Sequence, residues 1–470
     1  MSKALKIAAR IAGGIVILLM VAALICLEGI DYTPYFRTPY YKATMSQLHA
    51  LLLTNHPDAG LLEAGLGKAV LTPVGDLAKD KTGIAGPGLL PLAGFGGRKG
   101  RPATGVKDDV YVKAVAVRAQ SSVAVLVAAD ALIIPREVAD IAVQRAGTEF
   151  GLRRDQIYFG ATHTHASLGG WGEGFVAEAF AGKYQPAARL WFADRLVAAM
   201  REALSDIKPT SFGHGSFRDS GHLQNRLVGE LGNIDPEFSY LFFRRDDGRS
   251  AVLGSYDAHA TVLSSRNMQF SGDYPGAWER AVEAGTGGLA AFFAGAVGST
   301  SPNAGRNTPE PAEAMGRALA APLLEQLSKT PMTNFVSLQM LGVEVSLPSI
   351  HVRLTDGLRV RPWLSSKLLR VKPTTFVQVL RLNDTAWVST PCDFSGELAL
   401  GVKDALSTRG LQVNVTSFNG DYIGYIIPSK YYHLDGYEPR VMSFFGPTMP
   451  DYLDELVKTL VKGVAPAPLR

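Results

Sequence analysis

The stretch Gln156–Trp171, QIYFGATHTHASLGGW, runs from an apolar strand segment into two histidines and then into a glycine-rich loop. Because side chains alternate along a strand, residues i and i+2 share one face, so the pattern predicts that His163 and His165 point into the same space. A lone histidine is more often a hydrogen-bonded core residue, and this alternative remains open for each of the two. The pair, placed among small residues at the end of a strand, favours a reaction centre.

Strands and helices alternate on both sides of this stretch. The segment Ser122–Asp130 is apolar almost throughout, which indicates a strand with both faces covered by other layers. We also expect strands at Val110–Ala119, Phe335–Leu347, Thr374–Asn383, Ala386–Thr390 and Leu411–Phe418, and helices at Pro135–Phe150, Pro186–Asp206, Pro309–Ser328, Glu397–Thr408 and Pro450–Lys462. The sequence therefore predicts an α/β fold, a mixed sheet core with flanking helices and additional antiparallel strands.

The composition excludes several classes of protein. With 470 residues, 47% of them hydrophobic and 19% charged, the chain can bury a large core. The net charge of +4 is small, and no basic cluster is interleaved with aromatic residues, so we expect no nucleic-acid partner. The two cysteines, Cys26 and Cys392, form no disulfide framework and no metal knuckle. Any metal site must therefore use nitrogen and oxygen ligands.

The loop PLAGFGGRKGRPATG, residues 91–105, is rich in glycine and basic residues. It lacks the GK[ST] ending that would place a lysine and a hydroxyl at the start of a helix. We therefore expect no nucleotide partner.

The first 30 residues are predicted to be a membrane anchor or signal segment. Residues Ile11–Leu27 carry no charge, and Lys3, Lys6 and Arg10 precede them. The basic flank should stay in the cytoplasm, which places the rest of the chain on the periplasmic or extracellular side. Without a convincing cleavage site we favour an uncleaved anchor, with secretion after cleavage as the alternative. We expect residues 31–60 to be a spacer and residues 61–465 to be one catalytic domain.

Polar side chains follow several of the predicted strands, where α/β proteins commonly assemble their sites. They are His163, His165, His259, Ser301, Asp393, Tyr422 and Tyr425. Zinc accepts imidazole and carboxylate ligands and leaves a position open for water. Bound zinc lowers the pKa of that water and polarises a carbonyl oxygen, and amide hydrolysis at neutral pH needs both effects.

Six motifs in a fixed order extend the pattern over most of the chain. They are ATHTHASLGGWG, the Asn225–Arg226 pair of LQNRL, DAHATVL with SGDYPG, GSTSPN, PCDFSGE, and DYIGYIIPSKYY with GYEPRVMSFFGP. From about residue 61 to residue 462 the chain in this respect resembles the neutral/alkaline, non-lysosomal ceramidases.

The resemblance implies a zinc-dependent amidase that cleaves the N-acyl bond of ceramide or a related N-acyl lipid. It implies zinc ligands at His163, His259, Asp393 and Tyr425. It also implies that His165 faces the scissile amide or its oxyanion, that Ser301 is needed for turnover, and that Arg226 lies near the polar head of the substrate. We expect Tyr422 to contact the substrate as well. Whether water or Ser301 is the nucleophile stays open.

Two departures from the family pattern bear on the prediction, the first on the metal site and the second on ceramide specificity. The acidic ligand is usually glutamate, so Asp393 is one methylene shorter, and Glu397 is a nearby candidate to compensate. Longer family members continue into an immunoglobulin-like C-terminal domain, and we expect none here. Two alternatives therefore remain, a metal amidase that acts on other N-acyl compounds and a non-catalytic, membrane-tethered lipid-binding protein.

Overall fold

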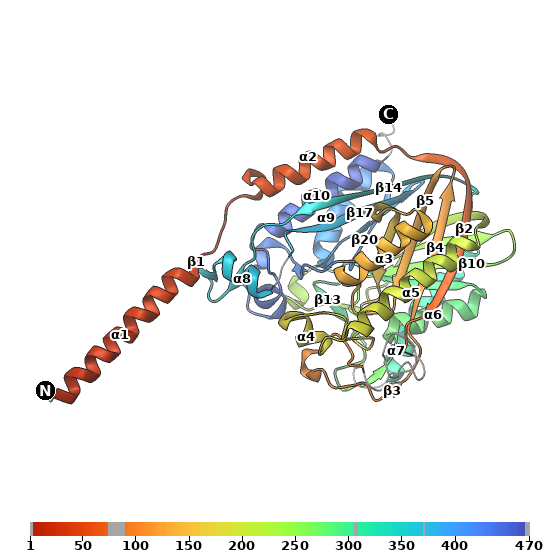
Figure 1. Cartoon of the computed structure of the whole chain (residues 1–470). Coiled ribbons are helices and arrows are strands. Elements are labelled where there is room, and N and C mark those ends of the chain that lie inside the picture. Colours follow the sequence, from red (N-terminus) through yellow and green to blue (C-terminus); the bar gives the residue numbers. More distant parts are fainter. Residues whose placement is uncertain (1–2, 74–89, 305–308, 370–371, 466–470) are drawn as a thin grey trace.

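A computed structural model describes residues 3–73, 90–304, 309–369 and 372–465 (Figure 1). In this part of the chain, twelve strands form one mixed sheet, in which the long strand β2 (Asp58–Val70) pairs with β4, β7 and β14. The other strands of the sheet are β4 (Tyr111–Ala119), β5 (Ser122–Ala129), β6 (Ile157–Ala161), β7 (Lys208–Arg218), β9 (Glu237–Arg245), β10 (Ser250–Tyr256), β12 (Leu289–Ala294), β14 (Phe335–Ser346), β17 (Thr374–Leu382), β18 (Thr385–Ser389) and β20 (Gln412–Thr416). The expected α/β fold class is confirmed.

Three strand pairs of this sheet are parallel, and a helix lies between the two strands of each pair in sequence. Helix α3 (Arg136–Phe150) connects β5 to β6, α6 (Asp273–Thr286) connects β10 to β12, and α9 (Gly396–Leu406) connects β18 to β20. Loops at the carboxyl ends of such strands commonly carry functional side chains. Here the segments after β6, β10, β12, β18 and β20 carry the predicted site residues except Arg226, which follows the short strand β8 (Leu223–Asn225).

The sheet is buried on both faces. In β5, Val125 and Val127 pack in the cluster that contains α3 and α5 (Pro186–Ser205), whereas Ala124 and Leu126 join a cluster built from strand residues alone. This alternation confirms the inference from the uninterrupted apolar segment. Other helices cover the rest of the sheet: α6 and α7 (Pro309–Leu327) pack beside β10 and β12, and α2, α9 and α10 (Met449–Val464) pack beside β14 and β17.

The segment expected to be a spacer, residues 31–60, is folded onto the body. It contains α2 (Pro39–Thr54), whose Met45 and Leu48 are buried in the same cluster as α10. The hydroxyls of Tyr35 and Tyr41 each donate a hydrogen bond of 2.6 Å to Glu455 of α10. The spacer prediction was wrong because Tyr35, Tyr40 and Tyr41 pack against Tyr452 of α10, although Tyr32 and Phe36 stay 53% and 52% exposed.

At the N-terminus, helix α1 (Lys3–Cys26) projects away from the body (Figure 1), and none of its residues is buried. By length and composition it could cross a membrane, although a signal sequence would pass the same test. It leads directly into β1 (Leu27–Gly29), the edge strand of a small sheet with β16 (Leu358–Val360) and β15 (Val352–Arg353). Helix α8 (Pro362–Leu369) follows β16 at this junction.

Candidate active site

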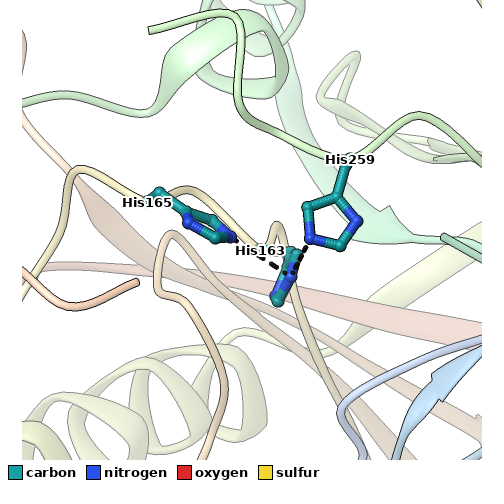
Figure 2. A group of neighbouring side chains, drawn as sticks. All are labelled: His163, His165 and His259. Carbon is teal, nitrogen blue, oxygen red and sulfur yellow. Dashed lines mark hydrogen bonds between the residues drawn. The ribbon is translucent and has the colours of Figure 1, made fainter. Parts of the chain in front are cut away.

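Three histidines meet beyond the ends of β6 and β10 (Figure 2). The ring of His163 lies 4.9 Å from that of His165 and 4.3 Å from that of His259, measured between centroids. The two histidines of the HTH motif share one space as predicted, but strand alternation is not the reason. Strand β6 ends at Ala161, and His163 has a φ of 61°, so a turn brings the two rings together.

The hydrogen bonds of His163 and His259 leave two imidazole lone pairs facing each other. Nδ1 of His163 donates to the carbonyl of Leu132 at 2.7 Å, and Nδ1 of His259 donates to the carbonyl of Val297 at 3.2 Å. In a neutral ring the Nε2 atom then has no hydrogen. The two Nε2 atoms are only 2.8 Å apart, a contact that a shared cation would stabilise.

Asp393 supplies an oxygen donor at the same point. Its side chain is completely buried, and Oδ2 accepts a hydrogen bond of 2.7 Å from the hydroxyl of Tyr422. The other oxygen, Oδ1, has no hydrogen-bond partner. It lies 3.4 Å from Nε2 of His163 and 3.9 Å from Nε2 of His259. A buried carboxylate oxygen without a partner is costly, and a bound metal ion would remove that cost.

Burial keeps these groups in unusual protonation states. It lowers the pKa of His163 to about 3 and that of His259 well below its ordinary value, so both imidazoles are neutral at pH 7. Burial also raises the pKa of Asp393 to about 7. Neutral imidazole is the form that binds metal, and two nitrogens with one carboxylate oxygen match the ligands that zinc prefers. The described residues therefore fit a zinc ion.

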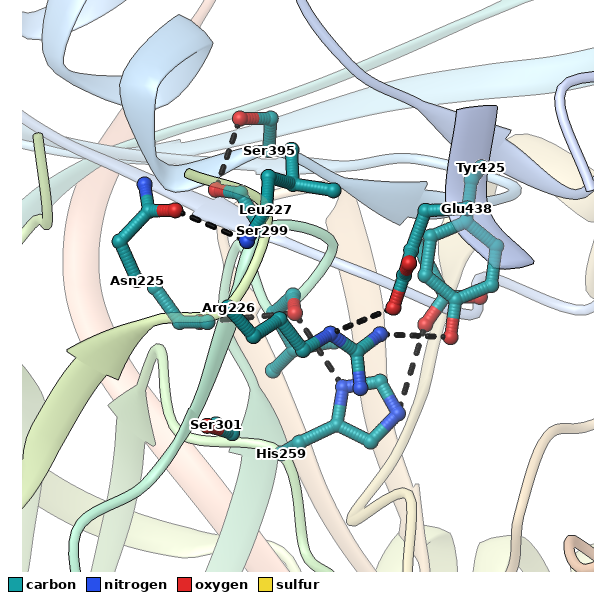
Figure 3. Close-up of polar contacts among 12 residues, drawn as sticks. Asn225, Arg226, Leu227, His259, Ser299, Ser301, Ser395, Tyr425 and Glu438 are labelled. Carbon is teal, nitrogen blue, oxygen red and sulfur yellow. Dashed lines mark hydrogen bonds and ion pairs between the residues drawn. The ribbon is translucent and has the colours of Figure 1, made fainter. Parts of the chain in front are cut away.

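Tyr425 lies beside Asp393 because the short strands β19 (Asp393–Phe394) and β21 (Tyr425–Ile426) are paired in parallel, with these two residues as partners. Its ring stacks on that of His259 with 6.4 Å between centroids. The phenol oxygen accepts a hydrogen bond of 2.9 Å from Arg226, whose guanidinium also pairs with Glu438 at 2.9 Å (Figure 3). Arg226 is thus held beside Tyr425, with its guanidinium carbon 5.5 Å from the centre of that ring.

His165 is the third member of the histidine group. The nitrogen atoms that the three rings offer all lie within 4.8 Å of one another, so His165 is within reach of the same ion. Burial lowers its pKa well below the ordinary value, and Nδ1 has no hydrogen-bond partner. This neutral ring has one nitrogen that can donate a hydrogen bond and one that can accept a hydrogen bond.

A glycine-rich loop holds His165 in place. The buried guanidinium of Arg98 donates to the backbone carbonyl of His165 and, at 2.8 Å, to that of Asn267. The ring of Phe95 lies 4.6 Å from that of His165, and a Cβ on Gly94 would come within 2.5 Å of the same ring. The loop 91–105, which lacks a nucleotide-binding motif, therefore forms one wall of the site that contains the three histidines.

A cavity of about 530 Å³ opens onto this group. Its lining includes seven predicted site residues, namely His163, His165, Arg226, His259, Ser301, Tyr422 and Tyr425. Ser301 lies on β13 (Thr300–Pro302), and its hydroxyl accepts a hydrogen bond of 3.1 Å from the amide of Gln224. The volume lies within the range of small-molecule sites.

Sequence reasoning missed several contributors and named one residue that lies elsewhere. Glu397 bonds to Lys430 and, at 3.1 Å, to the hydroxyl of Tyr431, so it does not replace Asp393. Glu438, the partner of Arg226, lies within the GYEPR motif, which was the available signal. The ring of Phe418 stacks 4.1 Å from that of His163, and nothing in the sequence pattern marked it.

The chain is similar to known proteins in its family and in its fold. The family model described as "Neutral/alkaline non-lysosomal ceramidase, N-terminal" matches residues 74–317. A search of curated proteins finds no match. Among solved structures, the fold is similar to that of neutral ceramidase from Pseudomonas aeruginosa, with a TM-score of 0.70 and 18% identity over 88% of this chain and 77% of that chain. It is also similar to a structure titled "Ceramidase complexed with C2", with a TM-score of 0.71 and 18% identity over 86% of this chain and 75% of that chain.

At 18% identity the two solved structures establish the fold alone. The family model covers a little more than half of the 470 residues, and the matched range contains His163, His165 and His259. The chain belongs to the neutral/alkaline non-lysosomal ceramidase family.

Proposed function

We propose that this protein is a zinc-dependent amide hydrolase that cleaves the N-acyl bond of ceramide or a related N-acyl lipid. The products are a sphingoid base and a fatty acid. Membership of the ceramidase family and the cavity beside the histidines support the reaction class. The observation that carries the proposal is the 2.8 Å contact between Nε2 of His163 and Nε2 of His259, with the unpartnered Oδ1 of Asp393 beside it.

His163, His259 and Asp393 would hold the zinc ion, and Tyr425 is the proposed fourth ligand. When bound, zinc would polarise the amide carbonyl and lower the pKa of water. Burial raises the pKa of Tyr425 well above its ordinary value, so without a cation its phenol keeps its proton. Arg226, which donates to this phenol oxygen at 2.9 Å, would favour the deprotonated form that a metal needs.

The other residues of the cavity act on the substrate. Hydrolysis adds a hydroxyl to the acyl carbon and a proton to the amine as the C–N bond breaks. His165, neutral because of its burial, would donate its N–H to the developing oxyanion, or would take the proton that the attacking water or Ser301 releases and pass it to the leaving amine. We propose that Arg226 and Tyr422, which both line the cavity, contact the polar head of the lipid.

The role of His165 can be separated from metal binding because the two roles predict different losses. If it acts on the amide, His165→Ala should lose ceramide hydrolysis and keep its zinc. If it is a ligand, both should fall together, as we expect for His163→Ala. Zinc content and ceramide turnover measured on the same variants distinguish these outcomes.

The nucleophile is either water or the hydroxyl of Ser301. Trapping a covalent acyl-enzyme at Ser301 would show that serine attacks the amide. Ser301→Ala should then lose turnover while it keeps its zinc, and full activity in this variant would remove Ser301 from the chemistry. Ser264→Ala is a matched control, because Ser264 lines the same cavity and, among the described residues, its hydroxyl accepts a hydrogen bond only from the nearby backbone of Arg266.

Two alternatives have distinct outcomes. A metal amidase for other N-acyl compounds would turn over short N-acyl amino acids faster than ceramide. A non-catalytic lipid-binding protein would bind ceramide without turnover and would not contain stoichiometric zinc. Rates on both substrate classes, measured beside metal content, decide among the three.

We further propose that α1 is an uncleaved anchor and that the body lies on the periplasmic or extracellular side, with secretion after cleavage as the alternative. The exposed apolar helix and its basic flank support this orientation. Full-length protein should stay with membranes after carbonate extraction. Release of the full-length chain would contradict the anchor.

A further inference from the structure

The small sheet at the end of α1 joins the anchor to the body without a linker. Helix α1 ends at Cys26 and β1 begins at the next residue, Leu27, which is paired with Val360 of β16. The backbone N–H of Arg361 donates to the carbonyl of Cys26 at 2.8 Å, and its side chain donates to the carbonyl of Leu27 at 3.0 Å. A membrane crossed by α1 would therefore lie directly against this sheet.

An ion pair strengthens this junction. Arg359 of β16 is buried and pairs with Glu28 of β1 at 2.8 Å. The backbone N–H of Ile30 also donates to the carbonyl of Gly357 at 3.1 Å. These contacts fix β1 in the sheet, so the end of α1 is attached to the body through β1 and through the bond from Arg361 to Cys26.

The same unit exposes large apolar side chains that the body leaves uncovered. Leu354 is 58% exposed, Leu358 is 42% exposed, and Trp363 of α8 is 57% exposed. The other four tryptophans of the chain are at most 5% exposed. Tryptophan and leucine at the end of a membrane-spanning helix are typical of the interface between headgroups and acyl chains.

The charges on this unit are mixed. Lys367 of α8 is exposed, and Arg440 pairs with Asp356 at 2.5 Å beside the very exposed Asp435. The unit carries four cations, but Arg359 is buried against Glu28, and Arg353 and Arg361 donate to backbone carbonyls. Among the described residues of the unit, Lys367 is therefore the one exposed cation that could attract anionic lipids. Attachment of the unit to a membrane should therefore depend on its apolar side chains.

The sheet is also tied to the wall of the reaction cavity. Arg353 of β15 donates to the carbonyl of Tyr432 at 2.8 Å and to that of Pro439, which lies in the π-helical turn Tyr437–Val441. In this turn Tyr437 lines the cavity, and its ring lies 5.9 Å from that of Tyr425. The exposed face of the unit and the wall of the cavity are thus parts of one connected structure.

We propose that β1, β15, β16 and α8 form a membrane-docking cap. Its apolar side chains Leu354, Leu358 and Trp363 enter the outer layer of the bilayer that α1 crosses. The cap thereby holds the turn Tyr437–Val441, and with it the reaction cavity, close to the membrane surface. An N-acyl lipid then reaches the site from the bilayer without passing through water. This docking rests on the proposed anchor, and its benefit rests on the proposed lipid substrate.

Tryptophan fluorescence tests the cap without reference to activity. The full chain is reconstituted in phosphatidylcholine vesicles whose acyl chains carry bromine, a short-range quencher, close to the headgroup. Quenching should remove the emission of one tryptophan out of five, and this component should be missing in Trp363→Phe. Added anionic lipid should not change it. Absence of quenching in the wild type, or equal quenching in Trp363→Phe, would overturn the cap.

A second measurement tests what the cap does for turnover. Trp363→Asp should keep its activity on a water-dissolved short-chain N-acyl analogue, because Trp363 does not line the cavity. Its rate on bilayer ceramide should fall by about tenfold, the scale set by the transfer of one large apolar side chain. Leu53→Asp is a matched control, since Leu53 is 79% exposed on α2 and away from the cap. Equal losses in the two variants would refute the role of the cap.

The two proposals fail in different ways. If the wild type hydrolyses no N-acyl substrate in either form, the proposed function is wrong, and the fluorescence result still decides whether the cap docks. If ceramide is hydrolysed and Trp363 is not quenched, the function stands and the cap is wrong.

Discussion

Replacement of Tyr422 by phenylalanine should weaken zinc binding. The phenol donates a hydrogen bond of 2.7 Å to Oδ2 of Asp393, and Oδ1 of the same carboxylate points toward the histidines. Tyr422→Phe removes this one bond and keeps the ring. We therefore propose that the hydroxyl orients the carboxylate for the metal, in addition to the contact with the lipid head proposed above.

The size of the effect follows from the kind of bond. A hydrogen bond to a charged acceptor contributes about 1.5–3 kcal/mol, which corresponds to a loss of about 10- to 150-fold in zinc affinity. Loss of an outer-shell partner of a metal ligand typically costs about 10- to 100-fold, which agrees. Competition between the purified protein and a chromophoric chelator measures this affinity directly.

Tyr431→Phe is the matched control, since the hydroxyl of Tyr431 bonds to Glu397, which is not a part of the histidine site. It should bind zinc like the wild type. If Tyr422→Phe also keeps the wild-type zinc affinity while its KM for ceramide rises, Tyr422 is a substrate contact, and the orienting role is refuted.

Two further substitutions test other parts of the structure. Gly94→Ala should lose hydrolysis and keep zinc, because at a φ of 115° its new Cβ would lie 2.5 Å from the ring of His165. Gly97→Ala is the control, since a Cβ at Gly97 meets nothing within 4 Å. Equal activity in the two variants would contradict the role of this loop. In the structure the ammonium of Lys113 lies 2.8 Å from the buried carboxylate of Glu279. Lys113→Met leaves this carboxylate without its partner and should lower the free energy of unfolding by about 3–5 kcal/mol. Urea denaturation measures this loss, and Lys113→Met combined with Glu279→Gln should recover part of it; an unchanged midpoint in the single variant would show that the pair does not stabilise the fold.

Much of the architecture could be predicted because it depends on local patterns. The predicted helix Pro135–Phe150 is α3 (Arg136–Phe150), and the predicted strand Thr374–Asn383 is β17 (Thr374–Leu382). Apolar periodicity, glycine and proline define such elements within one or two residues. The packing of α2 was missed because its few buried residues contact α10, which lies about 400 residues later in the sequence.

The sequence identified the residues of the candidate site, but it did not predict how their side chains are arranged. The motif order named His163, His259 and Asp393, which the fold brings together. The turn that places His163 at a φ of 61° has no sequence signal comparable to strand alternation. The support of His165 by Arg98 joins residues 67 positions apart, and only the tertiary structure reveals it.

The central claim is that a zinc ion joins His163, His259 and Asp393 and is required for hydrolysis. Zinc stoichiometry and the release of fatty acid from ceramide, measured on one preparation of the full chain, test it most directly. We expect about one zinc per chain, with both zinc and activity lost in His163→Ala and in chelator-treated protein, and activity restored to the treated protein by added zinc. Ceramide hydrolysis that persists at the wild-type rate in a metal-free preparation would contradict the claim.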